Sequence, residues 1–184
     1  GLAAAAALSR RGVAVTLVEQ APRISEVGAG LQISPNGMSV LRAMGLEAKL
    51  KERSAVRAQA VVLQDYKAGS QVARLDLMRG QAGHPYMFVH RADLIDILFG
   101  AAKRGNVSVE LGESVQEVLP GDPPTLQMLQ KTRRRAEVII DASGIHSKTR
   151  AALNGDDAAQ FSGQVAWRAL VPNRFDHPAE AHVT

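Results

Sequence analysis

The chain has 184 residues, of which 46% are hydrophobic and 22% charged, a composition that suits a folded domain and excludes a disordered segment. Its formal net charge is +4, but the densest basic cluster (residues 131–135) has no aromatic residues beside it, so we expect a solvated hairpin loop and no nucleic-acid partner. The chain contains no cysteine, which excludes disulfides, thiolate catalysis and cysteine-ligated metals.

The remaining expectations from composition concern location. No apolar run reaches the roughly 18 residues that a membrane span needs, so we expect no membrane partner. The absence of cysteine is consistent with the reducing cytoplasm, and we expect a cytoplasmic protein without a metal site.

The first elements follow in chain order. Residues 2–11 are rich in Ala and Leu and predict a helix that Gly12 ends. The β-branched run 13–18 then predicts a buried strand, closed by Glu19. Residues 25–37 predict a glycine-rich loop.

A second helix is expected to begin at Pro35, with Ser34 as its N-cap, and to end at Gly45. Further helices are expected over residues 91–104, closed by Gly105, and over residues 147–153. Strands are expected at residues 56–64, 71–77, 86–90, 107–111, 113–119, 126–130, 138–140 and 164–171. This order predicts an α/β fold with an antiparallel insertion.

The opening helix, glycine, strand and acid have the order of the second half of a dinucleotide-binding βαβ unit. In such units a glycine-rich turn admits the pyrophosphate, and an acid about 20 residues later binds the ribose. Glu19 lies 18 residues after Gly1, which fits if Gly1 is the last glycine of the turn. An ordinary helix and strand ending in Glu is the alternative.

The segment GLAAAAALSRRGVAVTLVEQAP, residues 1–22, resembles the FAD-dependent aromatic-ring monooxygenases of the salicylate hydroxylase type. The resemblance implies that Gly1, Glu19 and Gln20 contact the cofactor. The segment VGAGLQISPNGMSVLRAMGL resembles the next signature of this family, which places Gly30 against the flavin and Gln32 near flavin and substrate. A surface turn is the alternative for this loop.

Two further segments carry the resemblance. In YMFVHRADLIDIL, residues 86–98, the resemblance implies that Arg91 contacts FAD. A guanidinium at the start of a helix is repelled by the positive end of the helix dipole. An anionic cofactor beside Arg91 would offset that repulsion. A solvent-facing Arg91 is the alternative, and we expect His90 to be structural.

In VIIDASGIHSKTR, residues 138–150, the resemblance is to the family's Gly-Ala-Asp-Gly motif and keeps Gly144. Asp141 stands where that motif has its first Gly and Ser143 where it has Asp, so altered handling of the nicotinamide reductant is expected. FSGQVAWRALVP, residues 161–172, resembles the opening of the substrate domain, with Trp167 and Arg168 as its distinctive pair, although a core aromatic and a solvated arginine are the alternative.

The resemblance implies a Rossmann-like three-layer FAD/NAD(P)-binding fold with an antiparallel β substrate-domain insertion, truncated at both ends. It implies FAD-binding segments at residues 1–55 and 91–156, substrate-side strands at 56–90 and the start of a substrate domain at 157–184.

The function implied is hydroxylation of a small aromatic acid or phenol, of salicylate or hydroxynicotinate type, with FAD, NADH or NADPH, and O2. The truncated chain is expected to be inactive alone, and no catalytic residue is assigned. The resemblance is compatible with a homodimer as the oligomeric state. A halogenase or polyprenyl reductase on the same scaffold, or an inactive fragment, is the alternative.

Overall fold

The computed structural model describes residues 1–24, 29–53, 55–79, 83–155, 160–165 and 169–184, without the side chains of residues 146, 151 and 152. The chain divides into two compact units. Unit 1 comprises Gly1–Ser25 and Leu98–Ala166, and unit 2 comprises Glu26–Ile97 and Trp167–Thr184. The helix α4 (Arg91–Arg104) has its first half in unit 2 and its second half in unit 1.

Unit 1 begins with the helix–strand pair that the sequence predicts. Helix α1 (Leu2–Ser9) ends two residues earlier than expected, and the chain reverses through Gly12, whose φ is +80°. Strand β1 (Thr16–Glu19) then pairs in parallel with β7 (Ser108–Leu111), in a register that sets Glu19 opposite Leu111. The predicted parallel α/β start is therefore present, with a strand shorter than residues 13–18 suggested.

The end of α4 is built around close contact with α1. The Ser9 hydroxyl donates a hydrogen bond to the Gly105 carbonyl, and a Cβ on Gly105 would collide with the Ser9 side chain. The left-handed residue after the helix is Asn106, with φ of 59°. Gly105 therefore provides space for packing, whereas Asn106 provides the conformation expected of the residue after a helix.

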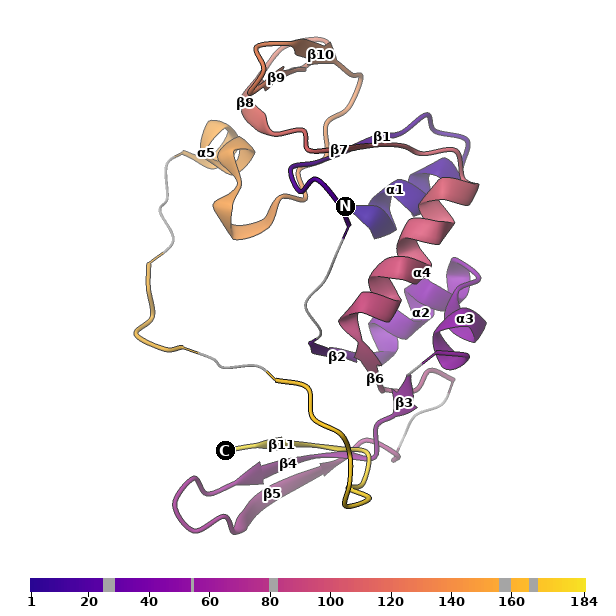
Figure 1. Ribbon diagram of the computed structural model, residues 1–184, viewed down its shortest axis with the longest axis vertical. Helices are drawn as coiled ribbons and strands as arrows, with labels where there is room; N and C mark the ends of the chain where they lie inside the picture. The colour runs from indigo at the N-terminus through magenta and orange to yellow at the C-terminus, as the bar shows by residue number, and fades with distance from the viewer. Residues whose placement is uncertain (25–28, 54, 80–82, 156–159, 166–168) are drawn as a thin grey trace. The chain divides into compact units, whose positions relative to one another are not determined.

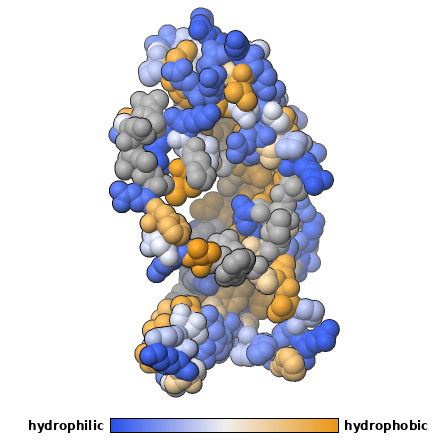
Figure 2. All heavy atoms as spheres, turned by 60° about the vertical axis from the view of Figure 1, so that its left-hand side comes forward, coloured by the Kyte–Doolittle hydropathy of each residue, from blue (hydrophilic) through white to orange (hydrophobic). Residues whose placement is uncertain are grey.

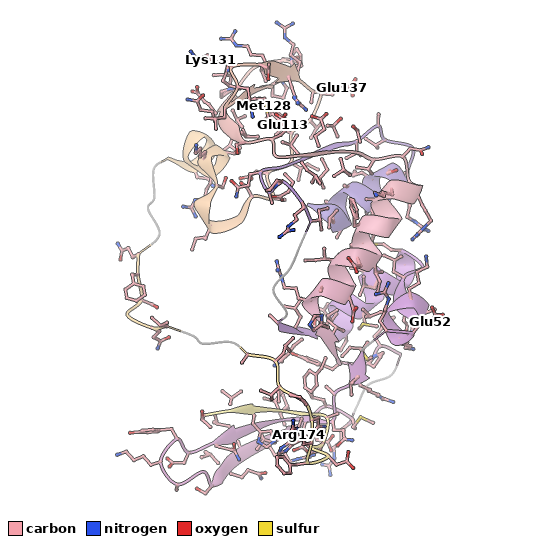
Figure 3. All side chains as sticks on the ribbon, in the orientation of Figure 1. Glu52, Glu113, Met128, Lys131, Glu137 and Arg174 are labelled. Carbon is pink, nitrogen blue, oxygen red and sulfur yellow. The ribbon has the colours of Figure 1, made fainter. Side chains whose placement is uncertain are left out.

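The remainder of unit 1 carries a small antiparallel sheet of order β10-β9-β8. Its strands are β8 (Val115–Leu119), β9 (Thr125–Met128) and β10 (Arg133–Arg135). Met128, labelled in Figure 3, is fully buried there. The exposed surface at this end of the unit is mostly hydrophilic (Figure 2).

The basic cluster is part of this sheet, so the expectation of a hairpin loop over its whole length is wrong. Lys131, with φ of 65°, is in the turn, and Arg133–Arg135 form strand β10. The Arg134 guanidinium forms ion pairs with Glu110 and, at 3.6 Å, with Glu113. These carboxylates allow an arginine-only strand to pair, which charge counting alone does not anticipate.

Unit 2 contains an antiparallel sheet of order β2-β6-β3. Its strands are β2 (Gly30–Ile33), β3 (Val56–Arg57) and β6 (Met87–His90). Helices α2 (Pro35–Ala43) and α3 (Glu47–Lys51) accompany it (Figure 1), and their buried residues Met38, Leu41 and Leu50 contribute to the core. Pro35 begins α2 as expected; Ser34 occupies the N-cap position without a side-chain hydrogen bond.

A second sheet of unit 2 has the order β11-β4-β5. Strands β4 (Ala60–Gln64) and β5 (Gln71–Asp76) form the predicted hairpin, and β11 (Glu180–Val183) lies parallel to β4, as Figure 1 shows. Residues 56–64 were expected to form one strand. The Ala58 N–H instead bonds the Tyr86 carbonyl and the Gln59 N–H bonds the Ala179 carbonyl, so the chain changes sheets between these two residues.

Three other expectations are corrected. Residues 30–33, expected in a loop, form β2 because β6 offers them a full antiparallel ladder. Residues 138–140 form no strand; Val138 is 73% exposed, and no strand among the described residues pairs with them. Within the expected strand 164–171, the described residues 164–165 and 169–171 are not in a strand, and the others lie outside the described residues. Helix α5 (Lys148–Asn154) follows a short 3-10 turn, η1 (Gly144–His146), close to the expected helix.

Candidate functional site

The part of the candidate site in unit 2 is a strand face. Along β2, Gly30 and Gln32 are exposed, whereas Leu31 and Ile33 are partly covered. The register sets Gly30 opposite His90 and Gln32 opposite Phe88. Because neighbouring residues of a strand point to opposite faces, these four residues share one face of the sheet.

Gln32 is held on this face by a residue that the sequence reasoning did not select. The Tyr86 hydroxyl donates a hydrogen bond of 2.9 Å to the Gln32 Oε1. The Tyr86 ring also meets the Phe88 ring edge to face, with centroids 6.4 Å apart. With its oxygen engaged by the phenol, the Gln32 amide presents its Nε2 group as a hydrogen-bond donor.

A cavity of about 250 Å³ lies at this face, lined by residues of β2, β6 and β11 that include Gln32, Phe88 and Glu180. The Glu180 carboxylate accepts a hydrogen bond of 2.7 Å from Arg74 and lies 3.6 Å from the His182 ring. The cavity therefore combines one aromatic wall, one amide and a carboxylate that is already paired with an arginine.

Arg91 is the first residue of α4, directly after β6. Its backbone N–H donates a hydrogen bond of 2.9 Å to the Ala29 carbonyl, which ties the start of the helix to the residue before Gly30. The structure thus brings Gly30, Gln32 and Arg91 together in unit 2, as members of one strand–strand–helix corner.

Unit 1 carries the other predicted residues. Gly1 is the N-cap of α1, and a Cβ on it would lie 3.4 Å from the Leu17 side chain of β1, so its lack of a side chain allows close packing of helix and strand. Glu19 ends β1, and its carboxylate accepts a hydrogen bond of 2.9 Å from the Ala21 N–H. Gln20 follows and is exposed. Gly1 and the carboxyl end of β1 are therefore at the same end of this helix–strand pair.

Gly144 occupies a separate turn of unit 1. Its φ of 83° is a left-handed conformation that favours glycine, and it begins the 3-10 turn before α5. The neighbouring Asp141 carboxylate accepts hydrogen bonds from the Ser143 N–H, at 2.9 Å, and from the Ser143 and Ser147 hydroxyls. A carboxylate is thus present in this turn although Ser143 replaces the acid of the family motif.

The protonation state of Asp141 follows from these contacts. Burial acts to raise the pKa of Asp141, but the hydrogen bonds from Ser143 and Ser147 and the charge of Arg150 together lower it below its ordinary value. The Ser147 hydroxyl, which is buried, also accepts a hydrogen bond of 3.0 Å from the Arg150 N–H. The carboxylate is therefore ionised at neutral pH and fixes the start of α5.

Sequence reasoning missed Tyr86, Phe88 and Glu180. The first two lie in the segment YMFVHRADL, where alternate residues face the same way once a strand is recognised, so alternation was the available signal. Glu180 had no such signal, because β11 is distant in sequence from the strand it joins. Trp167 and Arg168 lie outside the described residues.

In each unit, taken by itself, the described residues fit one part of a dinucleotide cofactor. Gly1 gives the close helix–strand contact, and Glu19 follows at the strand end where such folds bind a ribose. At Gly30 nothing lies within 4 Å of where a Cβ would be, so a flat ring could approach the backbone there. In the part of the chain that the structure describes, no group of His, Asp or Glu residues could hold a metal ion, and no helix is long and apolar enough to cross a membrane.

Comparison with known proteins identifies the family of the chain. The chain matches the FAD binding domain model over residues 1–180 and belongs to that family. It is 36% identical to the 3-amino-4-hydroxybenzoate 2-monooxygenase PtnB3 of Streptomyces platensis, over 97% of the chain and 46% of that protein. It is 35% identical to the 3-hydroxybenzoate 6-hydroxylase of Polaromonas naphthalenivorans (strain CJ2), over 95% of the chain and 44% of that protein.

Solved structures support the fold. The tetrameric form of 2-methyl-3-hydroxypyridine-5-carboxylic acid oxygenase matches with a TM-score of 0.72 at 23% identity, over 84% of the chain and 39% of that protein. The predicted FAD/NAD(P)-binding fold and the resemblance to FAD-dependent aromatic hydroxylases are confirmed. The chain spans about half the length of the curated relatives it matches.

Proposed function

We propose that the protein to which this chain belongs is an FAD-dependent monooxygenase that hydroxylates a small hydroxylated aromatic acid, with NADH or NADPH and O2 as co-substrates. The observation that carries the proposal is the strand face of Gly30, Gln32, Tyr86 and Phe88, in a chain of the FAD-binding family. The relatives named above act on hydroxybenzoates and an aminohydroxybenzoate, which supports this substrate class.

Each predicted residue receives a role in this proposal. Gly1, Glu19 and Gln20 would hold the nucleotide part of FAD, and Gly30 would lie against the flavin ring. Arg91, at the positive end of α4, would bind an anionic group of the cofactor. Gly144 would give the turn its shape. When bound, FAD supplies the activation of oxygen and the transfer of an oxygen atom to the ring.

The chain's own contribution to substrate binding would come from Gln32. The Tyr86 hydroxyl occupies the Oε1 atom, so the Nε2 group is the donor that faces an incoming acceptor such as a carboxylate or phenolate oxygen. Phe88 offers an apolar ring wall in the same cavity. This pairing of one donor and one ring matches an aromatic acid better than an aliphatic one.

The domain division remains part of the proposal: residues 1–55 and 91–156 would bind FAD, residues 56–90 would form the substrate-side strands, and residues 157–184 would open the substrate domain. A homodimer is compatible with it. A halogenase or polyprenyl reductase on this scaffold is a weaker alternative, since the relatives named above are an aromatic hydroxylase and a monooxygenase of an aromatic acid.

A chimera tests the function. This chain would replace the matching segment of the Polaromonas 3-hydroxybenzoate 6-hydroxylase, with the unaltered enzyme as reference. We expect the chimera to bind FAD, and to oxidise NAD(P)H faster in the presence of hydroxybenzoates than of their non-aromatic analogues. A folded chimera without flavin would contradict the cofactor assignment, and one that binds flavin without stimulation by any aromatic acid would contradict the substrate class. The isolated chain with FAD, assayed in parallel for NAD(P)H oxidation, tests the expectation that it is inactive alone.

A further inference from the structure

A second cavity in unit 2 encloses about 480 Å³ and is lined by residues of α2, α3, β3, the segment before β6, and β6 itself. It shares no lining residue with the cavity at Gln32. Met87 lines this cavity and Phe88 lines the other, and adjacent residues of a strand point to opposite faces. The two cavities therefore lie on opposite faces of β6.

The lining of this second cavity is cationic. Arg42, Lys51 and Arg57 each carry a positive charge, and Glu47 is the one carboxylate among the lining residues. Glu47 is shared: its Oε2 lies 2.5 Å from the Arg42 Nε and its Oε1 lies 2.8 Å from the Lys51 Nζ. Two positive charges thus remain uncompensated by the lining residues.

The ionisation of Glu47 keeps the net charge of the cavity lining constant around neutral pH. Hydrogen bonds from Arg42 and Lys51 lower the pKa of Glu47 to about 2, so the carboxylate is ionised at any pH at which the protein is handled. The excess of cations is therefore a property of the folded lining and does not depend on titration near neutral pH.

Two further groups of this lining lack partners among the described residues. Arg57 in β3, opposite Met87, has an exposed side chain and forms no ion pair there. The Nδ1 atom of His84 is buried from water and has no hydrogen-bond partner. This nitrogen is closed to a water-sized atom, so an oxygen atom in the cavity does not reach it; the lining groups that a ligand can reach are the exposed cations Lys51 and Arg57.

We propose that this cavity binds a phosphate-bearing small molecule, whose phosphate oxygens accept hydrogen bonds from Arg57 and Lys51. A phosphate monoester carries close to two negative charges, which match the two uncompensated positive charges of the lining. Arginine binds phosphate through paired N–H groups, and lysine binds it as a point charge. A volume of about 480 Å³ is within the range of small-molecule sites and leaves room for an organic group beside the phosphate.

The test uses the full 184-residue chain and inorganic phosphate and pyrophosphate as probes, at constant low ionic strength, with no flavin added. Binding is measured by calorimetry and by the chemical shifts of the His84 imidazole. We expect saturable binding of both probes with a shift of the His84 resonances, and at least a tenfold loss of affinity in Arg57→Gln. In Arg57→Lys, which keeps the charge, most of the affinity should remain.

Arg79→Gln is the matched control, because Arg79 is 90% exposed, belongs to the same unit and does not line the cavity. It should change the affinity less than twofold. Absence of saturable binding, or an equal loss in Arg79→Gln, overturns the proposal, because the second result would indicate unspecific attraction to a basic protein. Circular dichroism of each variant verifies that its fold is kept, and Lys51→Gln provides a second variant if Arg57→Gln does not fold.

Discussion

The two groups of candidate site residues, one in each unit, are built in different ways. In the strand group (Gly30, Gln32, Tyr86 and Phe88), the β2–β6 ladder fixes the three strand residues, and a hydrogen bond to Gln32 holds Tyr86, the residue before β6. The shape of this group depends on the core beneath the sheet. The turn group (Asp141, Ser143, Gly144 and Ser147) is fixed by one positive φ and by side-chain hydrogen bonds within seven residues. The strand group should therefore respond to core mutations, and the turn group to local ones.

The largest effect expected comes from the core under the strand group. Met87 is 3% exposed and stands on the opposite face of β6 from Phe88. Met87→Ala should lower the free energy of unfolding by about 2–5 kcal/mol, because it removes buried methylene groups and leaves a cavity. Urea unfolding measures the change.

Met78→Ala is the control for this variant, since Met78 is 45% exposed and should change the stability by less than about 0.5 kcal/mol. Equal effects of the two substitutions would show that the strand group does not depend on a packed core, and the contrast between the two groups would fail.

The turn group should respond to a single added methyl group. Gly144 has a φ of 83°, a conformation that costs an L-residue roughly 1–2 kcal/mol, so Gly144→Ala should destabilise the chain by about that amount. Gly30 has no positive φ, and nothing lies within 4 Å of its missing Cβ. Gly30→Ala should leave the stability within about 1 kcal/mol of the parent.

The Gly30 substitution also distinguishes an effect on cofactor binding from an effect on stability. In the chimera, Gly30→Ala should weaken FAD binding although the stability changes by no more than about 1 kcal/mol, because the new methyl group would stand where the flavin approaches. Unaltered FAD affinity would place the flavin elsewhere. Fluorescence titration with FAD and urea unfolding of the same samples give both quantities.

A smaller effect is expected from the Tyr86–Gln32 hydrogen bond. Tyr86→Phe keeps the ring contact with Phe88 and removes the donor to the Gln32 Oε1, so the amide is free to rotate. A net loss of about 0.5–1.5 kcal/mol corresponds to a rise of roughly 2- to 12-fold in the KM for the aromatic acid, measured in the chimera. A change confined to kcat, or none at all, would show that the amide is not oriented by the phenol. Gln32→Leu should raise KM at least as much.

The sequence predicted the elements whose signals are local. The helix of residues 91–104 has the predicted bounds, because its apolar period and the glycine after it are contiguous. The hairpin of β4 and β5 is confirmed, since the turn between them is held by Asp65, whose carboxylate accepts hydrogen bonds from the N–H groups of Lys67 and Ala68. Gly144 is placed in a turn that requires glycine.

The strands that the sequence did not predict share a different cause. Each of the strands β2, β10 and β11 depends on residues distant in the sequence. Strand β2 pairs with a strand more than fifty residues later, and β11 pairs with β4 across more than a hundred residues. In β10, Glu110 and Glu113 neutralise the charge of Arg134. A window of sequence contains none of these partners. The sequence showed Asp141 in place of the motif's first Gly and Ser143 in place of its Asp, but not that the Asp141 carboxylate would accept hydrogen bonds from both serines.

The smallest effect expected concerns that carboxylate and its pH dependence. The pKa of Asp141 is lowered in the folded chain, so its ionised form stabilises the fold above the unfolded-state pKa of about 4, and this contribution is lost as the pH falls toward the folded value. Because Asp141 is exposed, solvent screening limits the contribution to less than about 1 kcal/mol. Asp141→Asn should lower the stability slightly at neutral pH and remove this part of the acid dependence.

Urea unfolding of the parent chain and of Asp141→Asn between about pH 3 and pH 6 tests this. The difference in the free energy of unfolding between parent and Asp141→Asn should shrink on acidification. A difference that grows on acidification would mean that Asp141 is protonated in the fold. The turn group would then contain no carboxylate, and Ser143 would leave the reductant side of the family motif without its charge.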